Sequence, residues 1–473
     1  MIPKISKIAD LKENSSTAII FDSSDQYQFA GFTNDEKKYV VGKLEKNNHC
    51  IVYKYPSMFF FFKPKVEKEI YLQLEAARKA GSKLYDALKE DNIETVQISD
   101  FSKSELAQAF IEGLLLSNYS FDKYKKEKDD FLLKSIEIVD SSITEIQIEE
   151  MLNLTQAVFY ARNLVNEPIS FLTANQFSIE IEKMGEEAGF SVDVFHKQKI
   201  EALKMGGLLA VNKGSIDPPT FNILEWKHEN AKNEKPIVLV GKGVVFDTGG
   251  LSLKPTPKSM DYMKSDMAGA AVVAASIYAL AKNKVAVHVI GLIPATDNRP
   301  DGNAYVPGDV ITMFDGTTVE IKNTDAEGRL ILADALSYAK KYTPELVIDI
   351  ATLTGAADIV AGKHASVVMG NTEEHIQKLK ETGNETFERL IEVPLWEEYA
   401  LPLKSTIADL NNLGIREAQS TIAGKFLEHF TDYNWIHLDT AGTPFLEEKD
   451  RYLPVGGTGF GTRLLFNFLR KFN

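Results

Sequence analysis

Three short segments of the chain carry side chains that could take part in one reaction. VGKGVVFDTGG (240–250) and MDYMKSDMAGAA (260–271) each contain lysine and aspartate, and NTDAEGRL (323–330) holds two acids two residues apart. Four carboxylates gathered in a partly buried cleft repel one another strongly unless cations neutralise them. Two divalent ions would balance four negative charges, and two-metal centres of this kind serve hydrolysis. The side chains expected to meet are Asp247, Asp266, Asp325, Glu327, Lys242 and Lys254.

Each segment also has an interpretation that needs no ligand. Thr324 and Glu327 fit a capping box that opens a helix. Asp247 fits an Asx turn into the glycines after it, and Asp266 fits a helix cap. The GKG triplet resembles a phosphate loop but lacks the GxxxxGK[ST] spacing. Arg329 resists the capping interpretation, because a cation in the first helical turn meets the positive end of the helix dipole.

Strand and helix patterns alternate from about residue 170 onward. Alternation of this kind favours a largely parallel sheet covered by helices on both faces. Sites in such folds lie beyond the carboxyl ends of the strands, where the three segments are expected. The predicted strands are 236–241, 285–295, 345–353 and 434–439, with a helix over 266–283, a helix after 327, and a hairpin over 309–323 that turns at Asp315-Gly316.

The first part of the chain predicts a smaller α/β domain in which no convincing catalytic cluster stands out. Its expected strands are 16–21 and 94–99, and its expected helices are 68–90 and 103–121. A long helix over about 142–167, ended before Pro168, is expected to connect the domains. The predicted organisation is an N-terminal α/β domain (1–145) with an oligomeric or regulatory role, a connecting helix (146–168), and a catalytic α/β domain (169–473) whose largely parallel mixed sheet is flanked by helices.

Composition and charge narrow the classes of function. The 473 residues are 44% hydrophobic and 25% charged, which is ordinary for globular proteins. A net charge of -14 disfavours a general surface for nucleic acid or anionic membranes. The single cysteine, Cys50, allows neither an internal disulfide nor a cysteine-based metal cluster. The N-terminal segment lacks a signal-peptide core and no apolar run approaches transmembrane length, so we expect a soluble, cytoplasmic protein.

The three chemical segments, taken with several others, closely resemble the leucyl aminopeptidases, which are exopeptidases with a dinuclear metal centre. NTDAEGRL is very specific for that family. The resemblance covers roughly residues 150–470 in the expected order and is looser over the first 140. The further matching segments are ARNLVNEP (161–168), GNAYVPGD (302–309), IDIATLTGA (348–356), HLDTAG (437–442) and TGFGTRLL (458–465).

The resemblance implies a role for each chemical residue. Asp247 and Glu327 would bridge two metal ions, and Asp325 would also offer its backbone carbonyl. Lys254 and Arg329 would form a catalytic pair outside the ligand set. Lys254 would stabilise the oxyanion, and Arg329 would hold a bicarbonate that acts as general base. The metal ligands implied are Lys242, Asp247, Asp266, Asp325 and Glu327.

The identity of the metal ions rests on two arguments that disagree. The resemblance implies Zn²⁺, with Mn²⁺, Mg²⁺ or Co²⁺ able to exchange at one position. Oxygen ligands with a single amine would by themselves favour Mg²⁺ or Mn²⁺. An ammonium cannot ligate a metal, so Lys242 must bind as a neutral amine, and burial beside two dications is expected to lower its pKa.

The implied reaction removes the N-terminal residue of a peptide, with leucine or another apolar residue preferred, when water activated by the metals attacks the scissile bond. Departures from the family pattern affect the substrate pocket: the 254–260 loop is one residue longer, Thr440 replaces an aliphatic residue, and 416–427 is a looser match. Plain core packing is an alternative for two of the pocket residues, Met263 and Ala441. The substrate-binding residues implied are Met263, Asn323, Thr352, Leu353, Gly355 and Ala441.

Three rival functions remain open on the sequence alone. A two-metal phosphoesterase would use the same charge balance, although such sites usually include histidine ligands. A non-catalytic scaffold would keep the fold with degenerate ligands, yet every implied ligand and catalytic residue is present. Nucleic-acid binding as a second role is disfavoured by the acidic balance. The resemblance also implies a homohexamer.

Overall fold

The computed structural model describes residues 2–22, 31–102, 104–128, 131–139 and 142–472. The chain forms two compact units, one of residues 1–156 with 448–455 and the other of residues 157–447 with 456–473. The boundary falls inside α4 (Glu145–Asn166), the single long helix expected from the apolar spacing. The late segment 448–455 belongs to the first unit, so this unit is not continuous in sequence. Within the described ranges, no helix is long and apolar enough to cross a membrane.

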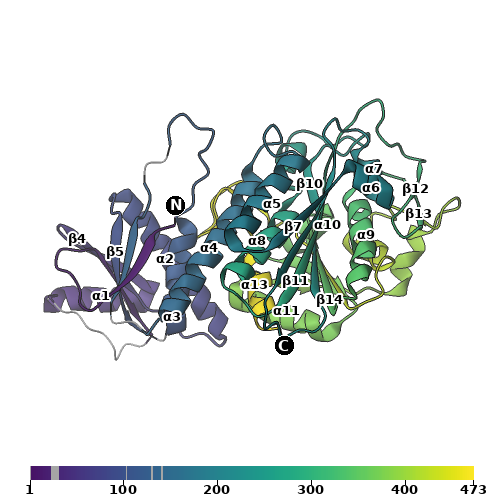
Figure 1. Ribbon diagram of the computed structural model, residues 1–473. Coiled ribbons are helices and arrows are strands. Elements are labelled where there is room, and N and C mark those ends of the chain that lie inside the picture. Colours follow the sequence, from purple (N-terminus) through teal and green to yellow (C-terminus); the bar gives the residue numbers. More distant parts are fainter. Residues whose placement is uncertain (1, 23–30, 103, 129–130, 140–141, 473) are drawn as a thin grey trace. The chain divides into compact units, whose positions relative to one another are not determined.

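The first unit, at the purple end of the scale in Figure 1, is a six-stranded sheet with helices packed on it. The strand order is β1-β6-β5-β2-β4-β3, and every neighbouring pair is parallel except β3 with β4. The predicted strands and helices of this region are confirmed, although residue 103 of the helix expected over 103–121 lies outside the described residues. The elements are β1 Lys4–Ile8, β2 Thr17–Phe21, α1 Asn34–Asn47, β3 His49–Lys54, β4 Ser57–Phe62, α2 Ile70–Glu90, β5 Thr95–Phe101, α3 Ser104–Ser117 and β6 Ser135–Val139.

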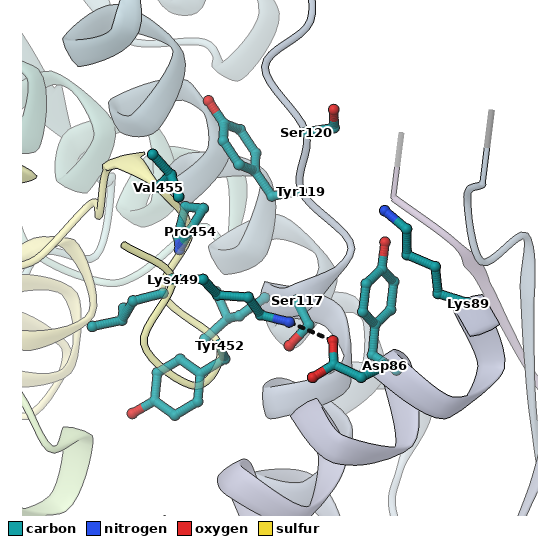
Figure 2. Close-up of a pocket in the computed structure, with 12 residues that line it drawn as sticks. Asp86, Lys89, Ser117, Tyr119, Ser120, Lys449, Tyr452, Pro454 and Val455 are labelled. Atoms are coloured by element: carbon teal, nitrogen blue, oxygen red, sulfur yellow. Dashed lines mark hydrogen bonds and ion pairs between the residues drawn. The ribbon is translucent and has the colours of Figure 1, made fainter. Parts of the chain in front are cut away.

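The returning segment 448–455 is fixed to α2 by buried polar contacts. Glu75 accepts a hydrogen bond from Arg451 Nη1 at 2.7 Å and another from the Tyr452 hydroxyl at 2.8 Å. A cavity of about 380 Å³ lies between α2, the end of α3 with the residues after it, and this segment. Figure 2 shows the lining side chains, among them the ion pair of Lys449 with Asp86.

The second unit contains a nine-stranded mixed sheet, which confirms the predicted fold class. The order is β16-β15-β18-β14-β9-β11-β8-β7, with β10 paired to β11. The central strands β18, β14, β9 and β11 are parallel, and antiparallel pairs occur toward the two edges. The strands are β7 Ser191–His196, β8 Thr220–Lys227, β9 Ile237–Gly241, β10 Gly243–Asp247, β11 His288–Asn298, β14 Leu346–Ala351, β15 Ser366–Gly370, β16 Leu390–Glu392 and β18 Trp435–Asp439.

Helices cover both faces of this sheet (Figure 1). Helices α5, α8 and α13 pack on one face, and α7, α9 and α12 on the other. The small residues of α8 allow a close approach to β14, since a Cβ on Gly269 would lie only 2.0 Å from the Ile350 carbonyl oxygen. The helices are α5 Ala174–Ala188, α6 Lys197–Leu203, α7 Gly206–Asn212, α8 Ala268–Lys282, α9 Gly328–Ala339, α10 Gly355–Ala361, α11 Glu373–Thr386, α12 Gln419–Glu428 and α13 Thr462–Arg470, and the 3₁₀ helices are η2 Met260–Ser265, η3 Lys340–Tyr342, η4 Gly362–His364 and η5 Glu397–Leu403.

The predicted hairpin leads directly into the acidic segment. Strands β12 (Val310–Thr312) and β13 (Thr318–Glu320) pair antiparallel, as expected for a turn at Asp315-Gly316. The short strand β17 (Leu410–Asn411) adds to β13 in parallel. Two further short strands, β19 (Phe445–Leu446) and β20 (Gly456–Gly457), form a separate antiparallel pair. The chain leaving β13 then runs beside Asn412, the residue after β17, before α9 begins.

Candidate active site

The three chemical segments meet at the carboxyl edge of the parallel strands. Lys242 follows β9, and Asp247 is the last residue of β10. Asp266 lies between η2 and α8, and Asp325 and Glu327 lie between β13 and α9. Strands end here because their apolar runs end, and the polar residues that follow lie at the carboxyl ends of the strands, where sites in such folds are found. The structure thus brings together residues that are up to 85 positions apart in the sequence, from 242 to 327.

Lys242 lies at the centre of one half of the cluster. Its side chain is 3% exposed, and its Nζ lies 2.8 Å from Asp266 Oδ1 and 2.9 Å from Glu327 Oε1. The same Nζ donates to the Thr352 carbonyl oxygen at 2.8 Å. Three oxygens around one nitrogen form a nearly complete coordination shell for an ammonium, and the same nitrogen as a neutral amine could be a metal ligand.

Lys254 organises the other half. Its Nζ lies 2.9 Å from Asp247 Oδ2 and forms a second ion pair with Asp325. One oxygen from each of Asp247, Asp325 and Glu327 lies within 4.8 Å of the others. Such spacing is close enough for three carboxylates to share ligation of metal ions, and it is costly without them because like charges repel at this distance.

The pKa values of the clustered acids and lysines indicate that the site has too little positive charge for its carboxylates. Burial, together with the neighbouring Asp247 and Glu327 carboxylates, raises the pKa of Asp325 to about 7. Burial also raises the pKa of Asp266 well above its usual range, even though the Lys242 ammonium opposes the shift. The pKa values of both lysines move in the opposite way to what burial alone would cause: burial lowers them, but the surrounding carboxylates raise them beyond the usual range. A divalent cation on these carboxylates would relieve their repulsion and lower the pKa of Lys242.

Two carboxylate oxygens of the cluster have neither a hydrogen bond nor an ion pair among the described residues, whereas Asp325 Oδ1 is at least paired with Lys254. They are Asp266 Oδ2 and Glu327 Oε2, on residues that are 5% and 2% exposed. A buried unpaired carboxylate oxygen is costly, and buried charges are usually paired or bound to metal. The donor set, the spacing and these two free oxygens together fit divalent cations.

The structure also tests the ligand-free interpretations. The capping box is wrong: α9 has Glu327 at its N-cap position with no side-chain cap, and the Thr324 hydroxyl instead donates to Gly249 O at 2.6 Å. The helix cap at Asp266 is wrong as well, because the N-cap of α8 is Met267. The Asx turn is confirmed, since Gly249 N donates to Asp247 Oδ1 at 2.8 Å. Asp247 nevertheless keeps its other oxygen, Oδ2, directed at Lys254.

Arg329 lies in the first turn of α9, as the sequence predicted, and is 3% exposed. Its Nη1 makes one long contact of 3.5 Å with Leu413 O, and its Nε has no hydrogen-bond partner among the described residues. Burial lowers the pKa of the guanidinium to about 10, although Glu327 and Asp439 oppose the shift. No carboxylate of the described chain lies within ion-pair distance of it. A buried guanidinium with free donors is suited to a small anion.

The implied substrate residues lie on loops at the same edge, and some of their polar atoms are already engaged. Thr352 donates its hydroxyl to Asp266 Oδ1 at 2.7 Å, and Asn323 Oδ1 accepts from Asp325 N at 2.7 Å. Leu353 N donates to Asp439 Oδ1 at 3.1 Å, so its carbonyl is the backbone group left to offer. Met263 lies in η2, Gly355 is exposed at the start of α10, and Ala441 follows β18 and packs beside a small apolar cluster of Ala357, Val367 and Met369.

Several supporting residues were missed by the sequence reasoning. Asn298 Nδ2 donates to Asp247 Oδ1 at 2.8 Å and to Thr324 O at 3.0 Å. Tyr305 donates to the same Thr324 carbonyl at 2.7 Å. Asp439 accepts hydrogen bonds from Leu353 N, Thr354 N, the Thr354 hydroxyl and the Ser420 hydroxyl, at 2.6 to 3.2 Å. Asn298 and Asp439 are the last residues of buried strands β11 and β18, and the carboxyl-end rule could have found both.

Comparisons with known proteins identify one family. The model of the cytosol aminopeptidase family catalytic domain matches residues 159–466, and that of the family's N-terminal domain matches residues 65–128. A probable cytosol aminopeptidase of Chlorobium phaeobacteroides is 46% identical over 384 residues, which are 78% of this chain and 75% of the relative. The solved structure of the bottromycin maturation enzyme BotP in complex with Mn has a TM-score of 0.85 at 29% identity, covering 97% of this chain and 99% of that one.

A variant of tomato leucine aminopeptidase shares the fold, with a TM-score of 0.87 at 24% identity over 100% of this chain and 97% of the other. The family model covers most of the second unit, and the Chlorobium relative is similar over three quarters of its own length. The edge of the sheet holds a cluster of carboxylates that could bind metal ions. The chain therefore belongs to the cytosol aminopeptidase family, and it is a metal-dependent aminopeptidase.

Proposed function

We propose that the protein removes the N-terminal residue, leucine or another apolar residue by preference, from peptides with a free N-terminus, and that it does so with two divalent metal ions. The observation that carries the proposal is the imbalance of four carboxylates against two lysines, with two buried oxygens left free. With Lys242 bound as a neutral amine, four carboxylates face the single Lys254 ammonium, and the resulting net charge of about -3 is more than one divalent cation can neutralise. The residues that would hold the two ions are Lys242, Asp247, Asp266, Asp325 and Glu327.

Zn²⁺ and Mn²⁺ are the cations we propose, with Mg²⁺ or Co²⁺ possible at one position. The Mn-bound state of the BotP structure supports manganese, and so do the oxygen-rich ligands. Bound there, the ions would supply Lewis-acid activation of water and of the scissile carbonyl. Lys242 must then be a neutral amine, and its burial against the site favours the loss of its proton once the carboxylates are neutralised.

Lys254 acts on the reacting carbonyl. Its Nζ sits between Asp247 and Asp325, at the open side of the cluster, with 14% of its side chain exposed. An ammonium in this position can donate to the oxyanion that develops as the peptide bond is attacked. Comparable donors contribute about 3 kcal/mol to transition-state stabilisation.

Arg329 provides the anion site. Its free Nε donor and full burial support a bicarbonate bound there, which would be an auxiliary base close to the ligands. Asp439 fixes the Leu353–Thr354 backbone, because its carboxylate accepts hydrogen bonds from both amide N–H groups. The Leu353 carbonyl is then presented in one orientation to a substrate amide.

The first-residue pocket that we propose is formed by Met263, Asn323, Thr352, Leu353, Gly355 and Ala441. The apolar members suit a leucine or methionine side chain. Ala441 packs against a small apolar cluster, which supports an apolar wall on that side. A panel of amino-acid amides assayed with defined metals would test the preference, and faster turnover of glutamate than of leucine amide would refute it.

The experiment that tests the reaction class compares leucine p-nitroanilide with p-nitrophenyl phosphate in the presence of Mn²⁺ or Zn²⁺. We expect release of p-nitroaniline and no significant phosphate release. Phosphate release alone would identify the rival two-metal phosphoesterase. Inactivity on both, with metal bound, would favour a non-catalytic scaffold.

Assembly and location are proposed on the same family basis. We propose a homohexamer, with the N-terminal domain (1–145) serving assembly or regulation, the helix over 146–168 as connector and 169–473 as the catalytic domain. Light scattering that gives a monomer would refute the hexamer. The names of the cytosol aminopeptidase relatives support a cytoplasmic location, which cell fractionation would test. Binding to nucleic acid is not expected, and a gel shift at moderate salt would reveal it.

A further inference from the structure

The acidic segment between β13 and α9 is flanked by a second segment that contains two consecutive asparagines. Strand β17 ends at Asn411, and Asn412 follows it. Both side chains are buried, Asn411 at 5% and Asn412 at 0% exposure. Buried amides are costly unless all their donors and acceptors are used, so their partners indicate what each side chain does.

Asn412 binds the backbone of the acidic segment through both its amide oxygen and its amide nitrogen. Its Oδ1 accepts from Lys322 N at 2.8 Å and from Asn323 N at 3.3 Å. Its Nδ2 donates to Asn323 O at 2.7 Å and makes a longer contact of 3.5 Å with Ala326 O. The amide therefore spans residues 322 to 326 and fixes their separation.

The bound backbone is the part of the chain that carries the candidate ligands. Asp325 lies inside the span of Asn412, and Glu327 follows it directly. Among the described residues, the hydrogen bonds of the Asn412 side chain all go to backbone atoms and none goes to the Asp325 or Glu327 carboxylate. Its influence on the ligands must pass through the backbone, because Asn412 holds Asn323 and Ala326, which flank Asp325, and Ala326 directly precedes Glu327.

The hydrogen bonds of Asn412 oppose the repulsion between the acids of the site. One oxygen from each of three acids lies within 4.8 Å of the others, and their repulsion tends to spread the segment that carries two of them. Metal ligation tolerates positional errors of only about 0.2 Å. A rigid backbone is therefore needed before a cation binds, and the loss of outer partners of ligands typically weakens metal binding by about 10- to 100-fold.

We infer that Asn412 is a positioning residue that sets the divalent-cation affinity of the acidic segment. The inference rests on the proposed function, since it assumes that Asp325 and Glu327 are metal ligands. Asn412 is neither one of the proposed ligands nor one of the proposed substrate-binding residues. It keeps Asp325 and Glu327 at the separation that cations require.

Asn411 offers a matched control on the adjacent position. Its Nδ2 donates to Pro402 O and Lys404 O at 2.9 and 3.0 Å, and its Oδ1 accepts from Leu413 N and Gly414 N at 3.0 Å. Asn411 thus uses its amide as fully as Asn412 does. None of its partners belongs to the acidic segment, so its loss should affect folding without changing the ligands.

The test replaces each asparagine by leucine, which has nearly the same shape but cannot hydrogen-bond. Mn²⁺ is titrated into metal-stripped, full-length protein by calorimetry, and the melting temperature is recorded for each variant. We expect Asn412→Leu to bind Mn²⁺ about tenfold more weakly or worse. We expect Asn411→Leu to stay within about twofold of the wild-type affinity, because its partners are independent of the ligands. Both variants should lose a similar amount of thermal stability.

Unchanged Mn²⁺ affinity in folded Asn412→Leu would overturn the inference, and so would an equal loss of affinity in both variants. If Asn412→Leu does not fold, alanine replaces leucine at both positions, because water can then occupy the place of the amide. The same difference between the two positions is expected, with a smaller size. Wild-type protein that binds no Mn²⁺ would overturn the proposed metal site itself, a result distinct from failure at Asn412 alone.

Discussion

Each unit of the molecule buries a cluster of acids and bases, and the two clusters differ in charge balance. In the first unit, Glu75 faces Arg451 at 2.7 Å, Arg78 at 3.7 Å and Lys79 at 3.9 Å. Glu112 and Asp450 pair with the two arginines as well, so carboxylates and cations are balanced in this cluster. In the catalytic unit four carboxylates share two lysines. Glu75, Asp247 and Glu327 are equally buried, with 2% of each side chain exposed, so burial of these acids does not distinguish the clusters. The surplus of negative charge does, and it separates a site that needs cations from an ion-pair network that holds a segment in place.

Glu327→Gln should have the largest effect. The substitution keeps the shape of the side chain but removes the charge and weakens any metal ligation at this position. We expect turnover of leucine p-nitroanilide to fall by more than about 100-fold, beyond the loss caused by removing an outer-shell partner. Asp247→Asn should behave alike, and circular dichroism should show the fold retained in both. Near-wild-type turnover in either variant would break the comparison, because the surplus of charge would then have no chemical role.

Chelation should silence the enzyme reversibly. Removal of divalent ions by a strong chelator is expected to abolish activity, and added Zn²⁺ or Mn²⁺ should restore it. Metal should also raise the melting temperature, because a ligand that binds only the folded state stabilises it. An enzyme that keeps its activity through exhaustive chelation would rule out a catalytic role for metal.

Glu75→Gln should affect stability and leave catalysis unchanged. The substitution removes the buried charge that Arg451 Nη1 and the Tyr452 hydroxyl bind, while Arg451 keeps its 3.2 Å pair with Asp450, so we expect a loss of about 2 kcal/mol. Urea unfolding would measure the loss, and kcat and KM of the folded protein should remain at wild-type values. A large fall in kcat without a loss of stability would mean that the first unit takes part in the reaction, and the contrast between the clusters would fail.

Metal affinity should depend on pH in a defined direction. The pKa of Asp325 is raised to about 7, so below that pH the carboxyl holds a proton that a cation must displace. Metal binding releases this proton, and the affinity should weaken by up to about tenfold for each unit of acidification below pH 7. The difference in melting temperature between metal-loaded and metal-free protein should therefore shrink as the pH falls from 7.5 to 5. An activity optimum near pH 5 would contradict this assignment.

The sequence predicted those features that follow from local patterns. Apolar runs located β9, β14 and β18, and the carboxyl-end rule located Asp247 and the residues that follow Lys242. The motif NTDAEGRL pointed to the family, which the comparisons confirm. These predictions succeed because the burial of a strand and the position of its carboxyl end depend on residues close together in the chain.

Features that depend on distant partners could not be predicted. The capping box at Thr324 matches its local pattern, but Gly249 and Ser252, more than 70 residues away, take its hydroxyl instead. The clamp of Asn412 on Asn323 spans 89 residues and has no periodicity to reveal it. Segment 448–455 belongs to the first unit, where Arg451 and Tyr452 bind Glu75, 376 and 377 positions away, so neither hydropathy nor helical spacing places it there.

Lys449→Ala should have the smallest effect on stability. It tests whether an exposed ion pair of segment 448–455 contributes less than the buried one. Lys449 pairs with Asp86 beside the cavity of the first unit (Figure 2), but their side chains are 43% and 55% exposed. Water screens such a pair, so its loss should cost less than about 1 kcal/mol in urea unfolding. Arg451 lies on the same segment as Lys449 but pairs with Glu75, which is buried in α2. Arg451→Ala should therefore lower the free energy of unfolding clearly more than Lys449→Ala does. Equal losses would mean that exposure does not set the strength of these pairs, and the buried position of Glu75 would then explain nothing about how the segment is held.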